Sequence, residues 1–146
     1  MPAPFKRPES VLIIICTTDQ QVLLMRRLHP EKFWQSVTGS LEDGEATQQT
    51  AERELFEETG LDILNSGTVV ENAGIQNIYP IHPAWRHRYH DKIQYNKEHV
   101  FIVRLETTCD IRFNPNEHCE YRWLNKQQAV ELCSSVTNTR AIKMLV

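Results

Sequence analysis

The sequence lacks three features that would each assign it to a class of protein. Its four cysteines show no Cys-x-x-Cys spacing, and its longest apolar run, Val11 to Cys16, is too short for a membrane span or a signal-peptide core. The net charge is -3, so there is no excess of positive charge for general nucleic-acid binding. These absences favour reduced thiols and a cytoplasmic location. We therefore expect no nucleic-acid or membrane partner, while the oligomeric state stays open.

The length and the pattern of apolar segments predict one domain, over residues 1–146, with a single buried core. Val11 to Cys16 is short and β-branched, so a strand fits it better than a helix, and Gln21 to Arg26 would form a hairpin with it. Further strands are expected within residues 61–70, around a turn at 65–67, and at 75–81, 100–105 and 121–124. Asn125 is expected to cap a helix over residues 126–133, and a last helix covers about 138–145.

The most informative stretch runs from Gly39 to Leu61, and its second half predicts a helix from about Ala46 to Thr59. Gly44 precedes this helix, and Gly60 suits the left-handed turn that follows it. The helix carries three glutamates at relative positions 0, 3 and 4, a spacing that gathers them on one face: Glu54, Glu57 and Glu58. Like charges so close repel one another, and a hard divalent cation such as Mg²⁺ would offset that repulsion. The alternative is a solvated acidic face.

The full pattern of the stretch decides between these alternatives. It reads Gly-x5-Glu-x7-Arg-Glu-Leu-x-Glu-Glu-x-Gly-Leu, which arises by chance on the order of once in a billion starting positions. The pattern resembles, without a departure, the signature of the Nudix hydrolases, which cut diphosphate linkages. The resemblance implies an α/β/α sandwich with a mixed sheet, and a loop-helix-loop unit that holds the metal. It also implies that Glu54, Glu57 and Glu58 are metal ligands, often joined by the carbonyl of Gly39.

Enzymes of this family often use one further acidic residue from outside the motif, as a metal ligand or as the base that activates water. Glu117 is the expected residue, with Glu98 and Glu120 as competitors. The expected catalytic residues are thus Glu54, Glu58 and Glu117, and the general base is either Glu54 or Glu117. The expected cofactor is Mg²⁺, for which Mn²⁺ can substitute.

Several segments outside the motif bear a narrower resemblance to one group within the family, the bacterial dihydroneopterin triphosphate pyrophosphatases of folate synthesis. The segments are Lys6 to Ile13, Phe33 to Ser40, Arg86 to Tyr89 and Asn138 to Ile142. The resemblance implies release of pyrophosphate from dihydroneopterin triphosphate, leaving the monophosphate. It places five residues around the substrate: Lys6, Arg26, Thr38, Tyr79 and Ser135. Two cations and three hydroxyls suit phosphate oxygens and ring edges.

Two other functions are compatible with the motif. An enzyme of the same type could act on a (deoxy)nucleoside triphosphate such as dATP, because the same metal site would serve. A non-catalytic module that senses a nucleotide is the third alternative, although such modules usually lack some of the glutamates. The stretch from Tyr79 to Tyr95 interleaves aromatic residues with arginines and histidines, which suits either a flat anionic ligand or an ordinary loop over the core.

Overall fold

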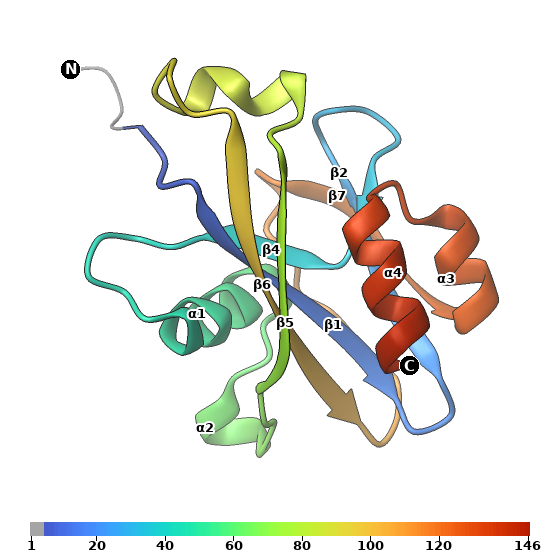
Figure 1. Ribbon diagram of the computed structural model, residues 1–146. Coiled ribbons are helices and arrows are strands. Elements are labelled where there is room, and N and C mark those ends of the chain that lie inside the picture. Colours follow the sequence, from blue (N-terminus) through green and yellow to red (C-terminus); the bar gives the residue numbers. More distant parts are fainter. Residues whose placement is uncertain (1–4) are drawn as a thin grey trace.

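A mixed sheet forms the centre of the protein, and helices cover both of its faces (Figure 1). The computed structural model describes residues 5–146. Within these residues the sheet has seven strands: β1 (Glu9–Thr17), β2 (Gln21–Arg27), β3 (Trp34–Gln35), β4 (Val37–Ser40), β5 (Glu71–Pro80), β6 (Tyr95–Leu105) and β7 (His118–Asn125). The helices are α1 (Thr47–Thr59), α2 (Ile63–Ser66), the 3-10 helix η1 (Pro83–Arg88), α3 (Lys126–Leu132) and α4 (Val136–Leu145).

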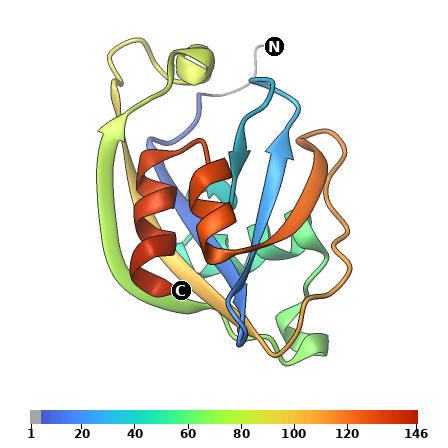
Figure 2. The ribbon, with the colours of Figure 1, turned by 90° about the vertical axis from the view of Figure 1, so that its right-hand side faces the viewer.

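Strand β1 is buried on both faces, and its alternating side chains belong to two separate clusters. Val11, Ile13 and Ile15 pack with Ala51 and Leu55 of α1. On the other face, a second cluster joins β1 to α3 and α4: Leu12, Ile14, Cys16, Ala129, Ala141 and Ile142. Figure 2 shows α3 and α4 lying side by side over this face. A strand covered on both faces is apolar throughout, as the sequence of β1 predicts.

The neighbours of β1 change along its length, and this change positions the site. Near the hairpin β1 pairs with β2, where Cys16 is opposite Val22. Toward its beginning β1 pairs instead with β4, where Ser10 is opposite Ser40, while β2 continues beside β3 and β7. On its other side β1 runs parallel to β6 throughout. The sheet therefore divides toward the start of β1, and residues from both branches can line one opening.

The predicted helix of the motif is confirmed as α1, which begins one residue later than expected. Gly60 ends it in the left-handed conformation, with φ of 78°, and its N–H donates to the carbonyl of Phe56 at 2.9 Å. The Asn125 cap is also confirmed, because its side chain accepts from the N–H of Gln128. No helix within residues 5–146 combines the length and apolar character needed to cross a bilayer.

The strand predicted between residues 61 and 70 is wrong. The segment forms the short helix α2, because the Asp62 side chain accepts from the N–H of Leu64 and Gly67 ends the turn at φ of 68°. Leu64 is 88% exposed, so the alternation of apolar and polar residues here does not mark a buried sheet face. The next strand, β5, starts at Glu71 and ends at Pro80, a position where proline costs no ladder hydrogen bond.

Candidate functional site

A cavity of about 600 Å³ opens where the sheet divides, and residues distant in the sequence line it. The lining includes the three motif glutamates from α1, Thr38 and Gly39 from β4, Arg27 at the end of β2, and Ser135 before α4. Aromatic side chains form another part of the wall: Phe33, Tyr79, His82, Trp85 and Tyr89. The cavity thus joins a charged, carboxylate-rich region to a region that can contact a flat ring.

The motif glutamates differ in burial although all three face this cavity. Glu54 and Glu58 are buried, and Glu57 has a side chain that is 48% exposed. Gly39 explains how Glu54 can lie so close to β4, because a Cβ at that position would be 2.1 Å from the Glu54 carboxyl carbon. Only glycine leaves that space free. The glycine of the motif therefore makes room for the first of its metal-ligand candidates.

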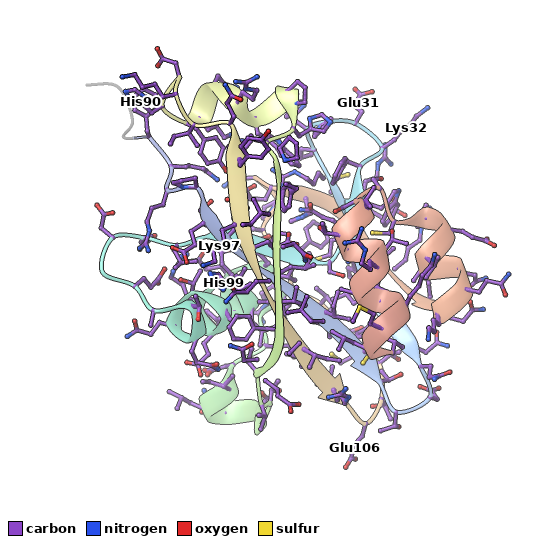
Figure 3. All side chains as sticks on the ribbon, in the orientation of Figure 1. Glu31, Lys32, His90, Lys97, His99 and Glu106 are labelled. Atoms are coloured by element: carbon purple, nitrogen blue, oxygen red, sulfur yellow. The ribbon has the colours of Figure 1, made fainter. Side chains whose placement is uncertain are left out.

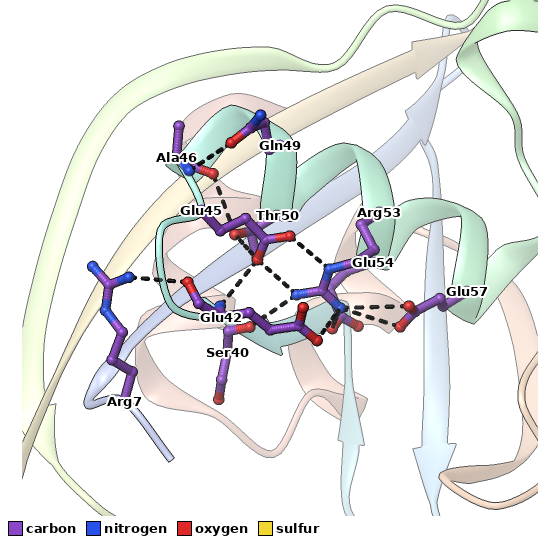
Figure 4. Close-up of polar contacts among 10 residues, drawn as sticks. All are labelled: Arg7, Ser40, Glu42, Glu45, Ala46, Gln49, Thr50, Arg53, Glu54 and Glu57. Carbon is purple, nitrogen blue, oxygen red and sulfur yellow. Dashed lines mark hydrogen bonds and ion pairs between the residues drawn. The ribbon is translucent and has the colours of Figure 1, made fainter.

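Arg53 holds Glu54, Glu57 and the loop before α1 in place (Figure 4). Its guanidinium forms a two-pronged pair with Glu45, in which both N···O distances are 2.8 Å. A third nitrogen, Nη1, donates to Glu54 at 2.8 Å and to Glu57 at 3.3 Å. Nη2, one of the two nitrogens paired with Glu45, also donates to the Ser40 carbonyl at 3.1 Å. Paired, planar contacts of this kind fix the orientation of a carboxylate better than a lysine could.

The electrostatic environment shifts the pKa values of two motif carboxyl groups in opposite directions. Burial raises the pKa of Glu54, Arg53 lowers it, and the neighbouring Glu57 and Glu58 raise it; the resulting pKa is about 7. Hydrogen bonds from Arg53 lower the pKa of Glu45 to about 2. Glu45 is therefore a permanent anion that anchors Arg53. Glu54 changes protonation near neutral pH and would ionise fully when a cation binds.

A divalent cation would find oxygen donors in this cavity. Within residues 5–146 no three His, Cys, Asp or Glu side chains are already arranged around one point as metal ligands. Instead, Arg53 pairs with Glu54 and His118 contacts Glu58. The donor set nevertheless fits a hard cation: the candidate ligands are carboxylates that line the cavity, and Glu54 is a buried acid packed against Gly39.

The structure separates the three candidates for the additional acidic residue. Glu117 lines the cavity, is partly exposed, and accepts from Arg27 at 3.4 Å. Glu98 also lines the cavity but is buried on β6. Glu120 is not among the lining residues and pairs with Arg26 and Arg122 on the outer surface of β7. Glu117 therefore stays the best-placed candidate.

Four of the five expected substrate-binding residues reach the cavity, and Arg26 does not. Lys6, Thr38, Tyr79 and Ser135 all line it. Arg26 faces away and pairs with Glu120 at 3.5 Å, whereas the next residue, Arg27, lines the cavity and lies over the Trp85 ring at 4.9 Å. The pairing of β2 with β7 shifts between these two arginines. We correct the expectation accordingly, because neighbouring strand residues face opposite sides and the sequence does not show which side is open.

The sequence interpretation missed His118. This side chain is 2% exposed, and its Nδ1 lies 2.9 Å from an oxygen of Glu58. Its Nε2 has no hydrogen-bond partner within residues 5–146, although it is buried at the cavity wall. The only available signal was that His118 follows Glu117 directly. Its pairing with α1 depends on a contact between residues 60 positions apart.

Comparison with known proteins extends these observations to the whole chain. The family model of the NUDIX domain matches residues 6–143. The dihydroneopterin triphosphate diphosphatase of Haemophilus influenzae is 37% identical over 142 residues, which cover 95% of this chain and 87% of that protein. The enzyme of the same name from Escherichia coli K12 is 36% identical over 143 residues, which cover 97% of this chain and 94% of that protein.

A solved structure shows the same similarity at the level of the fold. The Escherichia coli dihydroneopterin triphosphate pyrophosphohydrolase aligns with a TM-score of 0.92 at 36% identity, covering 97% of each chain. This likeness confirms the α/β/α sandwich with a mixed sheet that the motif implied. The NUDIX family model matches nearly the whole chain, and the chain covers most of the length of two relatives that are more than 30% identical to it. The chain therefore belongs to the Nudix hydrolase family.

Proposed function

We propose that this chain hydrolyses dihydroneopterin triphosphate to dihydroneopterin monophosphate and pyrophosphate, a reaction of folate biosynthesis. The observation that carries the proposal is the likeness to two dihydroneopterin triphosphate diphosphatases over nearly the full length of each chain. The cavity is consistent with such a substrate, because carboxylates and cations that suit a metal-bound triphosphate open into the same space as an aromatic wall. We place the reaction in a single domain and in the cytoplasm.

Nudix hydrolases generally use divalent metal ions, and we propose Mg²⁺ here, with Mn²⁺ as a substitute. Glu54, Glu57, Glu58 and Glu117 would hold the metal. When bound, Mg²⁺ supplies positive charge to the triphosphate and lowers the pKa of coordinated water. The hard oxygen donors of these four carboxylates match the preference of Mg²⁺ for carboxylate, water and phosphate ligands.

The side chains of this chain have distinct roles in the proposed reaction. Arg27 and Lys6 pair with phosphate oxygens, and Thr38 and Ser135 donate hydroxyl hydrogen bonds to the substrate. Either Glu54 or Glu117 accepts a proton from the attacking water, which enters in line at the α-phosphorus as pyrophosphate leaves. Tyr79 and the aromatic wall contact the pterin ring. Burial lowers the pKa of Lys6, yet an anionic substrate would favour its charged form.

The test is a comparison of substrates with purified protein and Mg²⁺. Dihydroneopterin triphosphate is compared with the common ribo- and deoxynucleoside triphosphates, with product identity measured as well as rate. We expect the highest kcat/KM for the pterin substrate and release of pyrophosphate without single phosphates. A higher kcat/KM for a nucleotide such as dATP would reject the pterin assignment, and the absence of any hydrolysis would reject an enzymatic role.

A further inference from the structure

A buried polar cluster lines the cavity on the face of the sheet covered by α4. It is built from neighbouring strands: Ser10 of β1, Tyr79 of β5, and Asn96 and Glu98 of β6. Side chains alternate along β6, so Asn96 and Glu98 share one side of the strand. Lys97 and His99, which Figure 3 labels, share the other side, where His99 contacts Glu9. The proposed function assigns no role to Asn96 or Glu98.

Glu98 is a carboxylate with unused acceptor capacity. Its side chain accepts from the amide of Asn77 and from the hydroxyl of Tyr79, both at 3.2 Å, and the residue is 2% exposed. No ion pair joins it to a Lys, Arg or His among residues 5–146. Hydrogen bonds from the neutral side chains of Thr137, Asn77 and Tyr79 do not offset the burial of an anion, so the pKa of Glu98 is raised. An uncompensated buried carboxyl group that faces a cavity is suited to a ligand with N–H donors.

Asn96 supplies a second acceptor beside the first. Its amide nitrogen donates to Ser10 at 2.7 Å and to the Tyr79 hydroxyl at 3.2 Å. Tyr79 in turn donates to Glu98, so the three side chains form one directed chain of hydrogen bonds. The amide oxygen of Asn96 is buried and has no partner within residues 5–146. Buried acceptors without partners are uncommon, and this one is next to the cavity.

The location of the cluster separates it from the carboxylates of α1. Charged side chains of the proposed phosphate-binding region shift one another's pKa values. Burial, Arg88 and Arg27 lower the pKa of Lys6, and Glu117 raises it. The pKa of Glu98 is affected by burial and hydrogen bonds alone. Glu98 accepts a hydrogen bond from Tyr79 of the aromatic wall, so it belongs to the part of the cavity where the substrate ring would lie. No Lys, Arg or His among residues 5–146 forms an ion pair with it, which argues against a role in phosphate binding.

We propose that Glu98, assisted by Asn96, recognises the adjacent N–H and NH2 groups of a 2-amino-4-oxopyrimidine edge, which pterins share with guanine. This inference rests on the proposed function and names the group that selects the ring. A carboxylate accepts two parallel N–H bonds, and such an edge offers two donors side by side. Adenine instead presents one donor beside a ring nitrogen that is an acceptor, which would face the carboxylate oxygens unfavourably.

The experiment compares Glu98→Gln with the wild type and with the control Glu120→Gln, which alters a partly exposed carboxylate outside the cavity. Binding of dihydroneopterin, which lacks phosphates, is measured by fluorescence titration, and kcat/KM is measured for dihydroneopterin triphosphate, dGTP, dITP and dATP. The glutamine keeps the size of the side chain but places an NH2 against the donors of the ring. We expect dihydroneopterin binding and kcat/KM to fall roughly 30- to 1,000-fold, mainly through KM, and the dGTP to dATP preference to shrink.

The outcomes separate this inference from the proposed function. If the wild type hydrolyses dihydroneopterin triphosphate and Glu98→Gln binds dihydroneopterin as the wild type does, the inference is overturned and the proposed function stands. If the wild type does not hydrolyse the pterin substrate, the proposed function fails. In that case, a wild-type preference for dGTP over dITP and dATP that Glu98→Gln abolishes would still support recognition of the ring edge by Glu98. The absence of such a preference would then overturn the inference as well. Thermal unfolding of each variant checks that the fold is retained.

Discussion

Glu57 is the motif glutamate whose contribution to activity can be separated from its contribution to the fold. Its side chain is 48% exposed and pairs only with Arg53 among residues 5–146. We therefore expect Glu57→Gln to leave thermal stability nearly unchanged. Turnover should fall at least about 100-fold, because a proposed metal ligand is lost while the core is intact. Steady-state kinetics at saturating Mg²⁺ measure the effect.

Glu52→Gln is the matched control for this substitution. Glu52 lies on the same helix but is not a lining residue, and its contact is to Gln48 at 3.3 Å. The control should keep turnover close to that of the wild type. Similar turnover in both variants would contradict the assignment of Glu57 as a ligand.

The adjacent arginines at the end of β2 provide a second comparison at the residue scale. Arg27 is nearly buried, with 10% of its side chain exposed, and it lines the cavity, whereas Arg26 pairs with Glu120 outside it. Arg27→Ala should raise KM for the triphosphate about 10- to 100-fold, since a charge-assisted contact to phosphate is lost. Arg26→Ala should change KM less than about twofold.

Initial rates over a range of substrate concentrations measure both variants, with thermal unfolding as the check on folding. A larger rise in KM for Arg26→Ala than for Arg27→Ala would refute the side-chain directions described here. A fall in kcat without a change in KM would mean that Arg27 acts on the transition state and contributes little to ground-state binding.

At the scale of elements, the ion pair between Glu45 and Arg53 joins the loop after β4 to helix α1. The pKa of Glu45 lies near 2 in the folded protein, below the ordinary value of 4.5. Its contribution to stability is therefore fully present above about pH 4.5 and is lost as the pH falls toward 2. Glu45→Gln should lower the free energy of unfolding by about 1–3 kcal/mol at pH 7.

Urea unfolding of the wild type and of Glu45→Gln at several pH values tests this contribution. The difference between the two proteins should shrink steadily below about pH 4.5 and be lost as the pH falls through about 2. A difference that stays constant over this range would show that the carboxylate charge has no part in holding the loop.

Helix α1 also shows how far local sequence determines an element. Its face of glutamates and its glycine stop follow from spacing within one helix, so the sequence sufficed to predict them. The segment after it was predicted as a strand because its apolar residues alternate. The side-chain cap at Asp62 produces a helical turn there instead. Competing local signals of this kind are decided by capping and by whether the rest of the fold buries the apolar residues.

For the whole molecule, cation binding should be linked to proton release. Burial raises the pKa of Glu54 from 4.5 to about 7 in the metal-free protein, and a carboxylate must lose its proton to bind a metal. We expect chelation of divalent metal to abolish hydrolysis and Mg²⁺ to restore it. We also expect the affinity for Mg²⁺ to increase as the pH rises to about 7 and to level off above it.

Calorimetric titration of the metal-free protein with Mg²⁺, in buffers of different ionisation enthalpy, measures both the affinity and the protons released. Hydrolysis that persists in excess chelator would contradict the requirement for metal. An affinity that does not change with pH below 7 would show that Glu54 is already ionised before the metal binds.

The sequence by itself determined the family, the helix that carries the three motif glutamates and the order of most elements. These depend on residues close together in the chain, where helix geometry alone brings Glu54, Glu57 and Glu58 to one face. The tertiary structure decided that Arg27 and not Arg26 reaches the cavity, that His118 contacts Glu58, and that Glu98 lies buried beside Asn96. Those arrangements depend on how strands and helices distant in the sequence pair and pack, and no local pattern of residues carries that information.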